Sequence, residues 1–279
     1  MQGETGSGKE VVARLVHELS ARAQGPFLAI NCGAMSRELL ESELFGHEKG
    51  AFTGAAGPKT GLVTAADGGT LFLDEMAEMP PPMQVALLRF LDRGEYRPVG
   101  STRTLHADVR IVGASNQDLQ TLVGQGRFRE DLFYRINALT LLVPGLRERK
   151  EDIPMLAEYF LRTVRGPGSS SRALSPEAKA ALAAYSWPGN IRELRNVIER
   201  MILMGTETAS ISGEEVRAVL PARESHTGDL SQHSLEDVER WHIERVLKAH
   251  DGNKSQAAKT LDIDYKTLLA KLKKYGLSG

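Results

Sequence analysis

Short apolar runs alternate with helix-length segments through the first half of the chain. The runs occupy residues 27–31, 70–73, 109–114 and 139–143. Runs that are almost continuously apolar and lie one helix apart are typical of parallel strands buried on both faces. The pattern therefore predicts an α/β fold, with a parallel sheet that helices cover on both sides.

Beyond residue 150 the strand-like runs give way to apolar positions at helical spacing. These positions recur in residues 153–164, 176–185 and 190–204, which predicts a small helical domain. Residues 166–171 are rich in Gly and Ser, so we expect a loop inside this domain.

The last part of the chain has the pattern of a separate helical unit. Residues 235–250, 254–261 and 265–275 are predicted helices, and a short turn joins the last two into a helix-turn-helix. The preceding stretch is polar, as expected of a linker. The predicted division is an α/β domain at 1–148, a helical domain at 149–220, a linker at 221–234 and a DNA-binding domain at 235–279.

The composition of the 279 residues, 41% hydrophobic and 25% charged, is that of a folded globular protein. No apolar run approaches the roughly 18 to 20 residues that span a bilayer, so we expect no membrane segment and a cytoplasmic protein. The single cysteine, Cys32, lies in an apolar run and is predicted to be a small buried residue rather than a reactive thiol. The histidines form no metal-binding motif.

A glycine-rich segment at the start of the chain fits a phosphate-binding loop. Its glycines let backbone N–H groups close around phosphate oxygens, and Lys9 neutralises the outer phosphates. A glycine-rich coil without a ligand is the alternative. Glu10 stands where a Ser or Thr often gives a hydroxyl ligand to Mg²⁺. The predicted nucleotide-binding residues are Gly3, Glu4, Thr5, Gly6, Ser7, Gly8, Lys9 and Glu10.

The second half of the predicted nucleotide site is an apolar run that ends in two acids. Asp74 at the strand end is placed to hold Mg²⁺, and Glu75 is placed to orient and deprotonate the attacking water. These two roles need carboxylates at neighbouring positions. An exposed acidic strand end is the alternative, and a phosphate loop about 65 residues upstream argues against it.

The most specific motif spans residues 46–55, with the sequence GHEKGAFTGA. This motif, with the phosphate loop and the Glu10 that follows its lysine, resembles the AAA+ activators of sigma-54 RNA polymerase, also called bacterial enhancer-binding proteins. The resemblance runs from about Gly3 to Leu277. It implies an AAA+ P-loop NTPase with a helical lid and a Fis-type helix-turn-helix. The strand that should precede the loop is expected to be missing, because Met1 stands just before Gly3.

The resemblance implies roles for five further residues. Asn31 matches the residue that switches the catalytic glutamate with nucleotide state, and Asn116 matches the first sensor, which reads the γ-phosphate. Arg129 and Arg135 match two arginine fingers that reach into the neighbouring subunit's site. Arg192 matches the second sensor, on the bound nucleotide. From sequence alone, a single arginine belongs more often to a solvated or ion-paired helix face.

A glycine-bounded loop inside an ATPase is unusual. The glycines allow uncommon backbone angles, and Phe52 offers apolar surface to a partner, although it can instead pack on its own helix. The resemblance implies that this loop contacts sigma-54 and that hydrolysis moves it. A second loop near residues 94–103 is expected to support it. The predicted sigma-54 contacts are Gly50, Ala51, Phe52, Thr53, Gly54 and Ala55.

The tail is locally basic, because its lysines face only two acids, Asp262 and Asp264, after residue 253. Asp262 stands at a turn position that often needs positive φ, which Asp tolerates. Asp264 is a suitable N-cap for the third helix, whose first residues can reach base edges. A lysine-rich solvated helix is the alternative. The predicted DNA contacts are Lys254, Ser255, Tyr265, Lys266, Thr267 and Lys271.

The expected function is ATP-dependent transcription activation. Fingers supplied in trans require neighbours, so we expect a homo-oligomeric ring, a hexamer, that uses ATP and Mg²⁺. The tail would recruit it to upstream double-stranded DNA, and turnover would drive the loop against sigma-54 RNA polymerase holoenzyme to open the promoter. The rival enzyme is another AAA+ machine, such as a chelatase or a helicase loader. The rival from another class is a DNA-binding regulator that no longer hydrolyses ATP.

Overall fold

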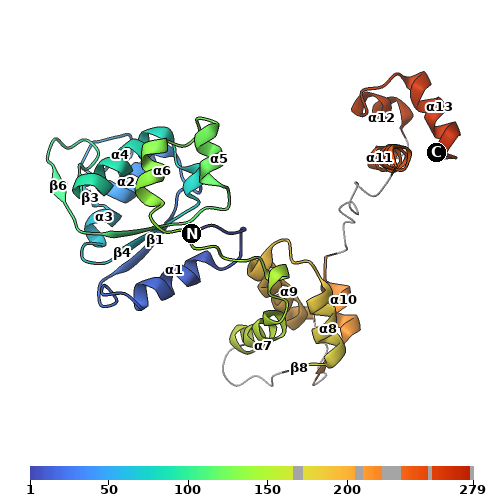
Figure 1. Ribbon diagram of the computed structural model, residues 1–279, viewed down its shortest axis with the longest axis horizontal. Coiled ribbons are helices and arrows are strands. Elements are labelled where there is room, and N and C mark those ends of the chain that lie inside the picture. Colours follow the sequence, from blue (N-terminus) through green and yellow to red (C-terminus); the bar gives the residue numbers. More distant parts are fainter. Residues whose placement is uncertain (166–171, 205–209, 222–233, 251–252, 277–279) are drawn as a thin grey trace. The chain divides into compact units, whose positions relative to one another are not determined.

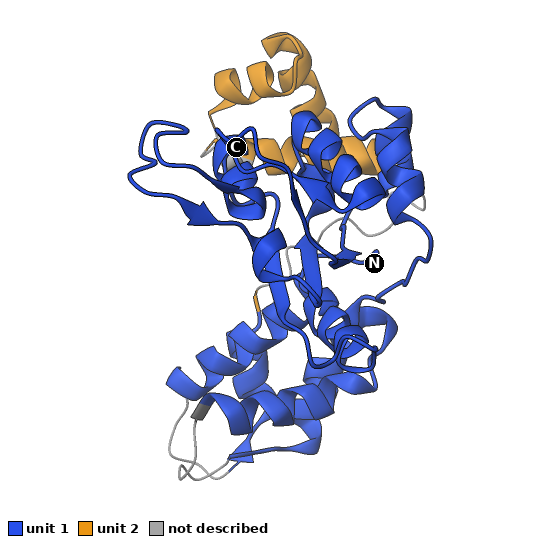
Figure 2. Ribbon diagram, turned by 90° about the vertical axis from the view of Figure 1, so that its left-hand side faces the viewer, with its two compact units in different colours: residues 1–220 blue, residues 221–279 orange. Residues whose placement is uncertain are grey.

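The computed structural model describes residues 1–165, 172–204, 210–221, 234–250 and 253–276. These residues form two compact units, 1–220 and 221–279, which Figure 2 shows in different colours. The predicted loop at 166–171 and nearly all of the predicted linker lie outside the described residues. The finer division at residues 148 and 220 stays a prediction.

The central sheet is parallel, with the strand order β1-β4-β7. Its strands are β1 (Phe27–Asn31), β4 (Thr70–Asp74) and β7 (Arg110–Gly113), which confirms three of the four predicted runs. The register places Asn31 beside Asp74, so the ends of two neighbouring strands meet at the same edge of the sheet.

Side chains of β4 alternate between two apolar cores, as the strand period of two requires. Leu71 and Leu73 point into the larger core, whereas Phe72 packs with Ala13 on the other face. Figure 1 shows α1 on that second face and α2, α4 and α6 on the first. The helices around the sheet are α1 (Lys9–Glu18), α2 (Arg37–Phe45), α3 (Leu62–Ala65), α4 (Pro81–Arg93), α5 (Leu119–Gly124) and α6 (Glu130–Ile136), with the 3-10 turn η1 (Met76–Glu78).

Two small antiparallel hairpins extend this part of the fold. They are β2 (Gly46–His47) with β3 (Lys59–Thr60), and β5 (Glu95–Tyr96) with β6 (Leu105–His106). Gly46 at φ 80° has no room for a side chain, because an added Cβ would lie 2.4 Å from the Lys59 carbonyl oxygen. The first hairpin can therefore close only on a glycine.

The fourth predicted strand, at residues 139–143, is wrong in extent. Leu142 forms an isolated parallel bridge with Gln2, and Gln2 also bridges Ser115. The N–H of Gln2 donates to the Leu141 oxygen, and the N–H of Val143 donates to the Gln2 oxygen. Among the described residues, pairing along this segment is limited to Gln2, so the segment stays extended without forming a ladder.

The predicted helical domain is present in the same unit. It contains η2 (Leu146–Glu148), α7 (Asp152–Arg165), α8 (Pro176–Ala184), α9 (Asn190–Met204) and α10 (Gly213–Val219), with the parallel pair β8 (Ala173–Leu174) and β9 (Ser210–Ile211). Trp187 is fully buried in its core and donates its Nε1–H to the Leu182 oxygen at 2.8 Å. That bond satisfies the indole, so the ring can fill the centre of the core.

The second unit consists of α11 (Leu235–Ala249), α12 (Lys254–Thr260) and α13 (Tyr265–Tyr275), as predicted. The small residues Ala257 and Ala258 are buried where α12 meets its neighbours. Asp262 has φ 52°, which confirms the expected positive angle at the turn. Asp264 occupies the N-cap position of α13, but its side chain makes no capping hydrogen bond, so the predicted cap is wrong in its chemistry.

Candidate functional site

The glycine-rich loop that leads into α1 encloses the ammonium group of Lys9. The Nζ of Lys9 donates to the carbonyl oxygens of Gly3 and Glu4 at 2.7 and 2.9 Å, and the side chain is only 7% exposed. Gly8 begins the helix at φ 99°. Ser7 is buried beside it, and its hydroxyl has no hydrogen-bond partner within the described part of the chain. The loop thus directs polar groups inward, as a phosphate cradle does.

Two carboxylates from the end of β4 act on Lys9 through their charge. Burial lowers the pKa of Lys9, while Asp74 and Glu75 oppose that shift and Arg192 adds to it. Such charge effects weaken with distance and with screening by solvent, so they are appreciable only between groups that lie near one another. The structure therefore brings together Lys9, Asp74, Glu75 and Arg192, which lie far apart in the sequence.

Glu75 adopts a left-handed backbone, with φ 53° and ψ 44°. Its N–H donates to Asp74 Oδ1 at 2.9 Å, so the first carboxylate orients the backbone of the second. A conformation of this kind costs a non-glycine residue free energy, and such strain is concentrated at functional sites. The turn aims the Glu75 carboxylate at the start of the β1–α2 connection, where an added Cβ on Gly33 would lie 2.7 Å from Glu75 Oε2.

Asn31 ends β1 beside this carboxylate. Its Oδ1 accepts the Gly33 N–H at 2.8 Å, and no hydrogen bond joins it to Glu75 within the described residues. The predicted switch residue is thus adjacent to Glu75 but bonded to its own turn. The neighbouring Cys32 is 1% exposed, and burial, then Asp74 and Glu75, raise its pKa to about 12. The thiol stays protonated at neutral pH, in agreement with its predicted structural role.

The predicted first sensor meets the loop directly. Asn116 follows β7, and its Nδ2 donates to Thr5 Oγ1 at 3.2 Å. The Gly3 N–H donates to the Ser115 oxygen at 3.2 Å, which ties the base of the loop to the same segment. Asn116 is exposed and can reach a group bound at the loop.

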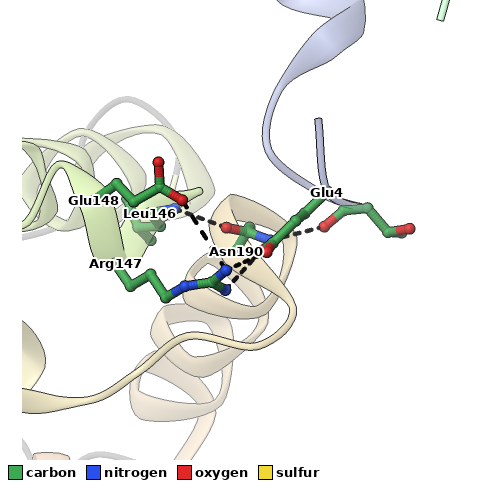
Figure 3. A network of polar contacts seen from close by, with 6 residues as sticks. Glu4, Leu146, Arg147, Glu148 and Asn190 are labelled. Atoms are coloured by element: carbon green, nitrogen blue, oxygen red, sulfur yellow. Dashed lines mark hydrogen bonds and ion pairs between the residues drawn. The ribbon is translucent and has the colours of Figure 1, made fainter. Parts of the chain in front are cut away.

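The helical domain clamps the other side of the loop. Figure 3 shows Asn190, at the start of α9, between the Glu4 carboxylate and the backbone of Leu146. Its Nδ2 donates to Glu4 Oε2 and to the Thr5 oxygen, and its Oδ1 accepts the Leu146 N–H at 2.7 Å. Arg147 binds Glu4 through both terminal nitrogens and, with Asn190, lowers the pKa of Glu4. Glu4 therefore stays ionised and joins the loop to the helical domain.

Backbone contacts strengthen this clamp. The Ile191 N–H donates to the Gly6 oxygen at 3.0 Å, and Arg149 donates to the Ser7 oxygen at 2.6 Å. An added Cβ on Gly6 would lie 2.4 Å from the Gly189 oxygen and 3.1 Å from the Cβ of Arg192. Gly6 must be glycine for the two parts to meet this closely.

Three predicted site residues are not gathered into this cluster. Glu10 is exposed on α1 and lies 3.7 Å from Arg14, so its side chain is directed away from the loop. Arg129, which precedes α6, forms an exposed ion pair with Asp131. Arg135 pairs with Asp92 at 3.2 Å. In this arrangement both arginines pair with acids outside the cluster, and neither belongs to the nucleotide site of its own chain among the described residues.

The glycine-bounded loop forms the tip of the β2–β3 hairpin. The Gly50 N–H donates to the Ala55 oxygen at 2.9 Å, with Gly50 at φ 81° and Gly54 at φ 108°. Thr53 is exposed, whereas Phe52 is half-buried and packs edge-on against His47, with ring centroids 5.0 Å apart. One face of the Phe52 ring is therefore covered in this conformation, which agrees with the alternative that it packs on its own chain, and its contact with sigma-54 stays a prediction.

The loop near residues 94–103 supports this hairpin, as predicted. The Val99 N–H donates to the Gly46 oxygen, and the Glu48 N–H donates to the Val99 oxygen at 3.0 Å. Gly100 has φ 79° and fits closely on Ala51, because an added Cβ would lie 2.8 Å from the Ala51 Cβ.

In the second unit the predicted DNA contacts separate into two groups. Tyr265, Lys266 and Thr267 are exposed on the first turn of α13, and Ser255 is exposed near the start of α12. Lys271 instead forms an ion pair with Glu239 of α11, and Glu239 also accepts the Tyr275 hydroxyl at 2.6 Å. Lys254 is half-buried on α12. Lys271 thus packs against α11 in this structure, and its contact with DNA stays a prediction.

Sequence reasoning missed Arg147, Asn190 and Arg149. Each has a partner in the glycine-rich loop, either a backbone oxygen or the Glu4 carboxylate, more than 140 positions away along the chain. Asn190 offered one local signal in the sequence, because it follows Pro188 and Gly189 at a helix start. In the structure it has φ 54°. Asn is one of the few residues that tolerate this angle.

The parallel layer, the loop around Lys9, the acid pair at a strand end and the helical domain that clamps the loop define a P-loop protein of the AAA+ fold. The chain belongs to the family of the sigma-54 interaction domain, whose family model matches residues 1–142. The family models for an AAA+ ATPase lid domain and for the Fis family of bacterial regulatory proteins match residues 147–233 and 234–275.

Characterised relatives match along nearly the whole chain. It is 44% identical to the regulatory protein AtoC of Escherichia coli and 50% identical to the alginate biosynthesis transcriptional regulatory protein AlgB of Pseudomonas aeruginosa, with 99% of this chain covered in each case. The chain spans 62% and 61% of the length of these two relatives.

Solved structures agree with the fold. The crystal structure of NtrX from Brucella abortus is 36% identical, with a TM-score of 0.72 over 99% of this chain and 63% of that chain. A second NtrX structure, in complex with ATP, has a TM-score of 0.69. Among the described residues, no helix is long and apolar enough to cross a membrane.

Proposed function

We propose that this chain is the motor and DNA-binding part of a transcription activator that hydrolyses ATP to remodel sigma-54 RNA polymerase holoenzyme. The observation that carries the proposal is the cluster of Lys9, Asp74 and Glu75 beside a loop that the helical domain clamps. The family, the similarity to the regulatory proteins AtoC and AlgB, and the ATP complex of NtrX support it. The match to the sigma-54 interaction domain counts against a chelatase or a helicase loader.

The loop residues fit the phosphates of a nucleotide. The buried Ser7 hydroxyl lacks a partner among the described atoms, and the positive φ of Gly6 and Gly8 opens the loop for backbone donors. Asp74 fits Mg²⁺, which is usually held by one or two carboxylates together with phosphate oxygens. Within the described residues, no group of three or more potential ligands forms a metal site of its own. Mg²⁺ would neutralise phosphate charge when bound.

Residues of this chain would then perform the remaining steps. Lys9 would hold the outer phosphates, and Glu75 would accept a proton from the attacking water. Asn116 would contact the γ-phosphate, since it is exposed and already touches Thr5. Arg192 would contact the nucleotide from the side of the helical domain, where its Cβ faces Gly6.

The same proposal gives Arg129 and Arg135 a site in a neighbouring copy. Both side chains are about half exposed and are held by weak surface ion pairs, which exchange readily for a phosphate. A ring of copies, a hexamer in our proposal, would let each subunit supply these arginines to the next.

The hairpin loop at residues 50–55 would contact sigma-54 and transmit the effect of ATP hydrolysis to it. Thr53→Ala is expected to leave ATP turnover within about twofold of the parent, because Thr53 is an exposed residue of the hairpin tip. Formation of the open promoter complex should fall by at least about tenfold if Thr53 is a contact hot spot. The measurement compares ATPase rate with open-complex yield on a sigma-54 promoter, and Thr60→Ala at the base of the hairpin is the matched control. A parallel loss of both activities in Thr53→Ala would instead place the loop in the catalytic fold.

The second unit would bind the upstream DNA through the exposed start of α13. Lys266→Ala is expected to weaken binding and to reduce the slope of log K against log salt by about 1, because one phosphate contact is lost. Lys271→Ala removes a lysine from the same helix, but Lys271 pairs with Glu239 of α11. This variant should therefore lower the melting temperature and leave the salt slope close to that of the parent. Titrations of a labelled duplex at several salt concentrations distinguish these results. Equal salt slopes for the two variants would contradict the assignment.

A further inference from the structure

Gln84 is a fully buried glutamine on α4 whose amide is used entirely by backbone groups. Its Nε2 donates to the carbonyl oxygens of Met79 at 2.9 Å and Arg127 at 3.1 Å. Its Oε1 accepts the N–H of Arg129 at 2.8 Å. Two acceptors and one donor fix the orientation of the amide, because only NH₂ can serve two carbonyls.

The three backbone groups belong to two segments of different roles. Met79 ends the 3-10 turn η1, which starts directly after Glu75 and is anchored by the Met76 N–H on the Ala114 oxygen. Arg127 and Arg129 lie in the segment that enters α6, with Arg129 at its N-cap. Gln84 is thus the hydrogen-bonded connection between the turn behind the acid pair and the segment that carries an exposed arginine.

The burial pattern of residues 127–129 indicates that the hydrogen bonds of Gln84 fix the direction of this segment. Phe128, between the two bonded residues, is 3% exposed and anchors the segment in the core. The Arg129 side chain is exposed, and among the described residues its ion pair is with Asp131 in the first turn of α6. The backbone of Arg129 is therefore set from the inside by Gln84, while its guanidinium is free to exchange partners.

We propose that Gln84 is a positioning residue for Arg129: it sets the angle at which the start of α6 presents this arginine to the neighbouring subunit. This inference rests on the proposed in-trans role of Arg129. Because Gln84 also holds Met79, a shift of the turn behind Glu75 in one subunit would move the arginine that serves the next site.

The test uses the full chain and the variant Gln84→Met, which keeps the length of the side chain and removes all three bonds. We expect nucleotide affinity within about twofold of the parent and kcat lowered about 10- to 100-fold, as for a misplaced catalytic group. Arg89→Ala, an exposed position on the same helix, is the matched control and should keep its kcat.

Mixing of subunits separates positioning in trans from a general loss of structure. Gln84→Met mixed with Lys9→Ala should recover hydrolysis, because an intact Arg129 then faces an intact nucleotide site. Gln84→Met mixed with Arg129→Ala should not recover, because neither subunit presents the arginine correctly. No recovery in the first mixture, under conditions in which Arg129→Ala with Lys9→Ala does recover, overturns the inference. If that reference mixture also fails, the in-trans role itself is overturned, and this inference with it.

Gln84→Glu supplies a readout that does not depend on folding of the methionine variant. The introduced carboxylate would face two carbonyl oxygens, and its burial would raise its pKa. Only the protonated acid can donate to one of them. The ATPase ratio of Gln84→Glu to the parent should therefore rise as pH falls from about 8 to about 6, and a ratio independent of pH overturns the proposal.

Discussion

Glu75→Gln is expected to abolish ATP turnover while leaving nucleotide affinity nearly unchanged. The substitution keeps the size of the side chain and the Asp74 carboxylate, but an amide cannot accept the proton of the attacking water. Loss of a general base costs about 10²- to 10⁴-fold in rate. The measurement pairs steady-state ATPase with the affinity for a fluorescent ATP analogue, so that catalysis and binding are read separately.

Glu78→Gln is the matched control for this prediction. It makes the same change of charge at an exposed position three residues further along the chain, in the turn that follows Glu75. Its turnover should remain close to that of the parent. Turnover of Glu75→Gln within tenfold of the parent would exclude Glu75 as the base.

Arg129→Ala is expected to inactivate a pure population and to regain activity in mixtures. Arginine fingers contribute about 10³ to 10⁵ in rate where they have been measured. In a mixture with Lys9→Ala, some sites combine an intact loop with an intact arginine from the next subunit, so ATPase should pass through a maximum as the ratio is varied. The exposed Arg127→Ala is the control. A mixture that stays inactive at every ratio would show that Arg129 does not act on a neighbour.

The sequence predicted much of the fold because local patterns determine it. The run that became β4 ends in Asp74 in both prediction and structure, and α9 and α13 have their predicted bounds. The segment at 139–143 was predicted less well, because an apolar run carries no information on its pairing partner. In the structure that partner is Gln2, which lies at the start of the chain, far from residues 139–143 in the sequence.

The candidate site was predictable where its chemistry lies in contiguous motifs. Lys9, Asp74 and Glu75 were identified in this way. Asn190 and Gln84 were not identified, because they form hydrogen bonds with backbone groups of distant segments. The residues next to them in the sequence do not indicate which segments these are. The ion pair of Lys271 was not predicted either, because a basic residue on a recognition helix has the same sequence pattern whether it faces DNA or a carboxylate of α11.

The clamp on the loop has a consequence for biosynthesis. Asn190 lies 186 positions after Glu4, so the two halves of this contact leave the ribosome far apart in time. At typical synthesis rates the delay is about 10 to 40 s. Strands β1, β4 and β7 can pair during that interval, whereas the Glu4 carboxylate and the Thr5 oxygen still await their partners. We expect the nucleotide site to mature after the sheet, and nascent chains that end before α9 to hold ATP poorly even when the sheet has formed.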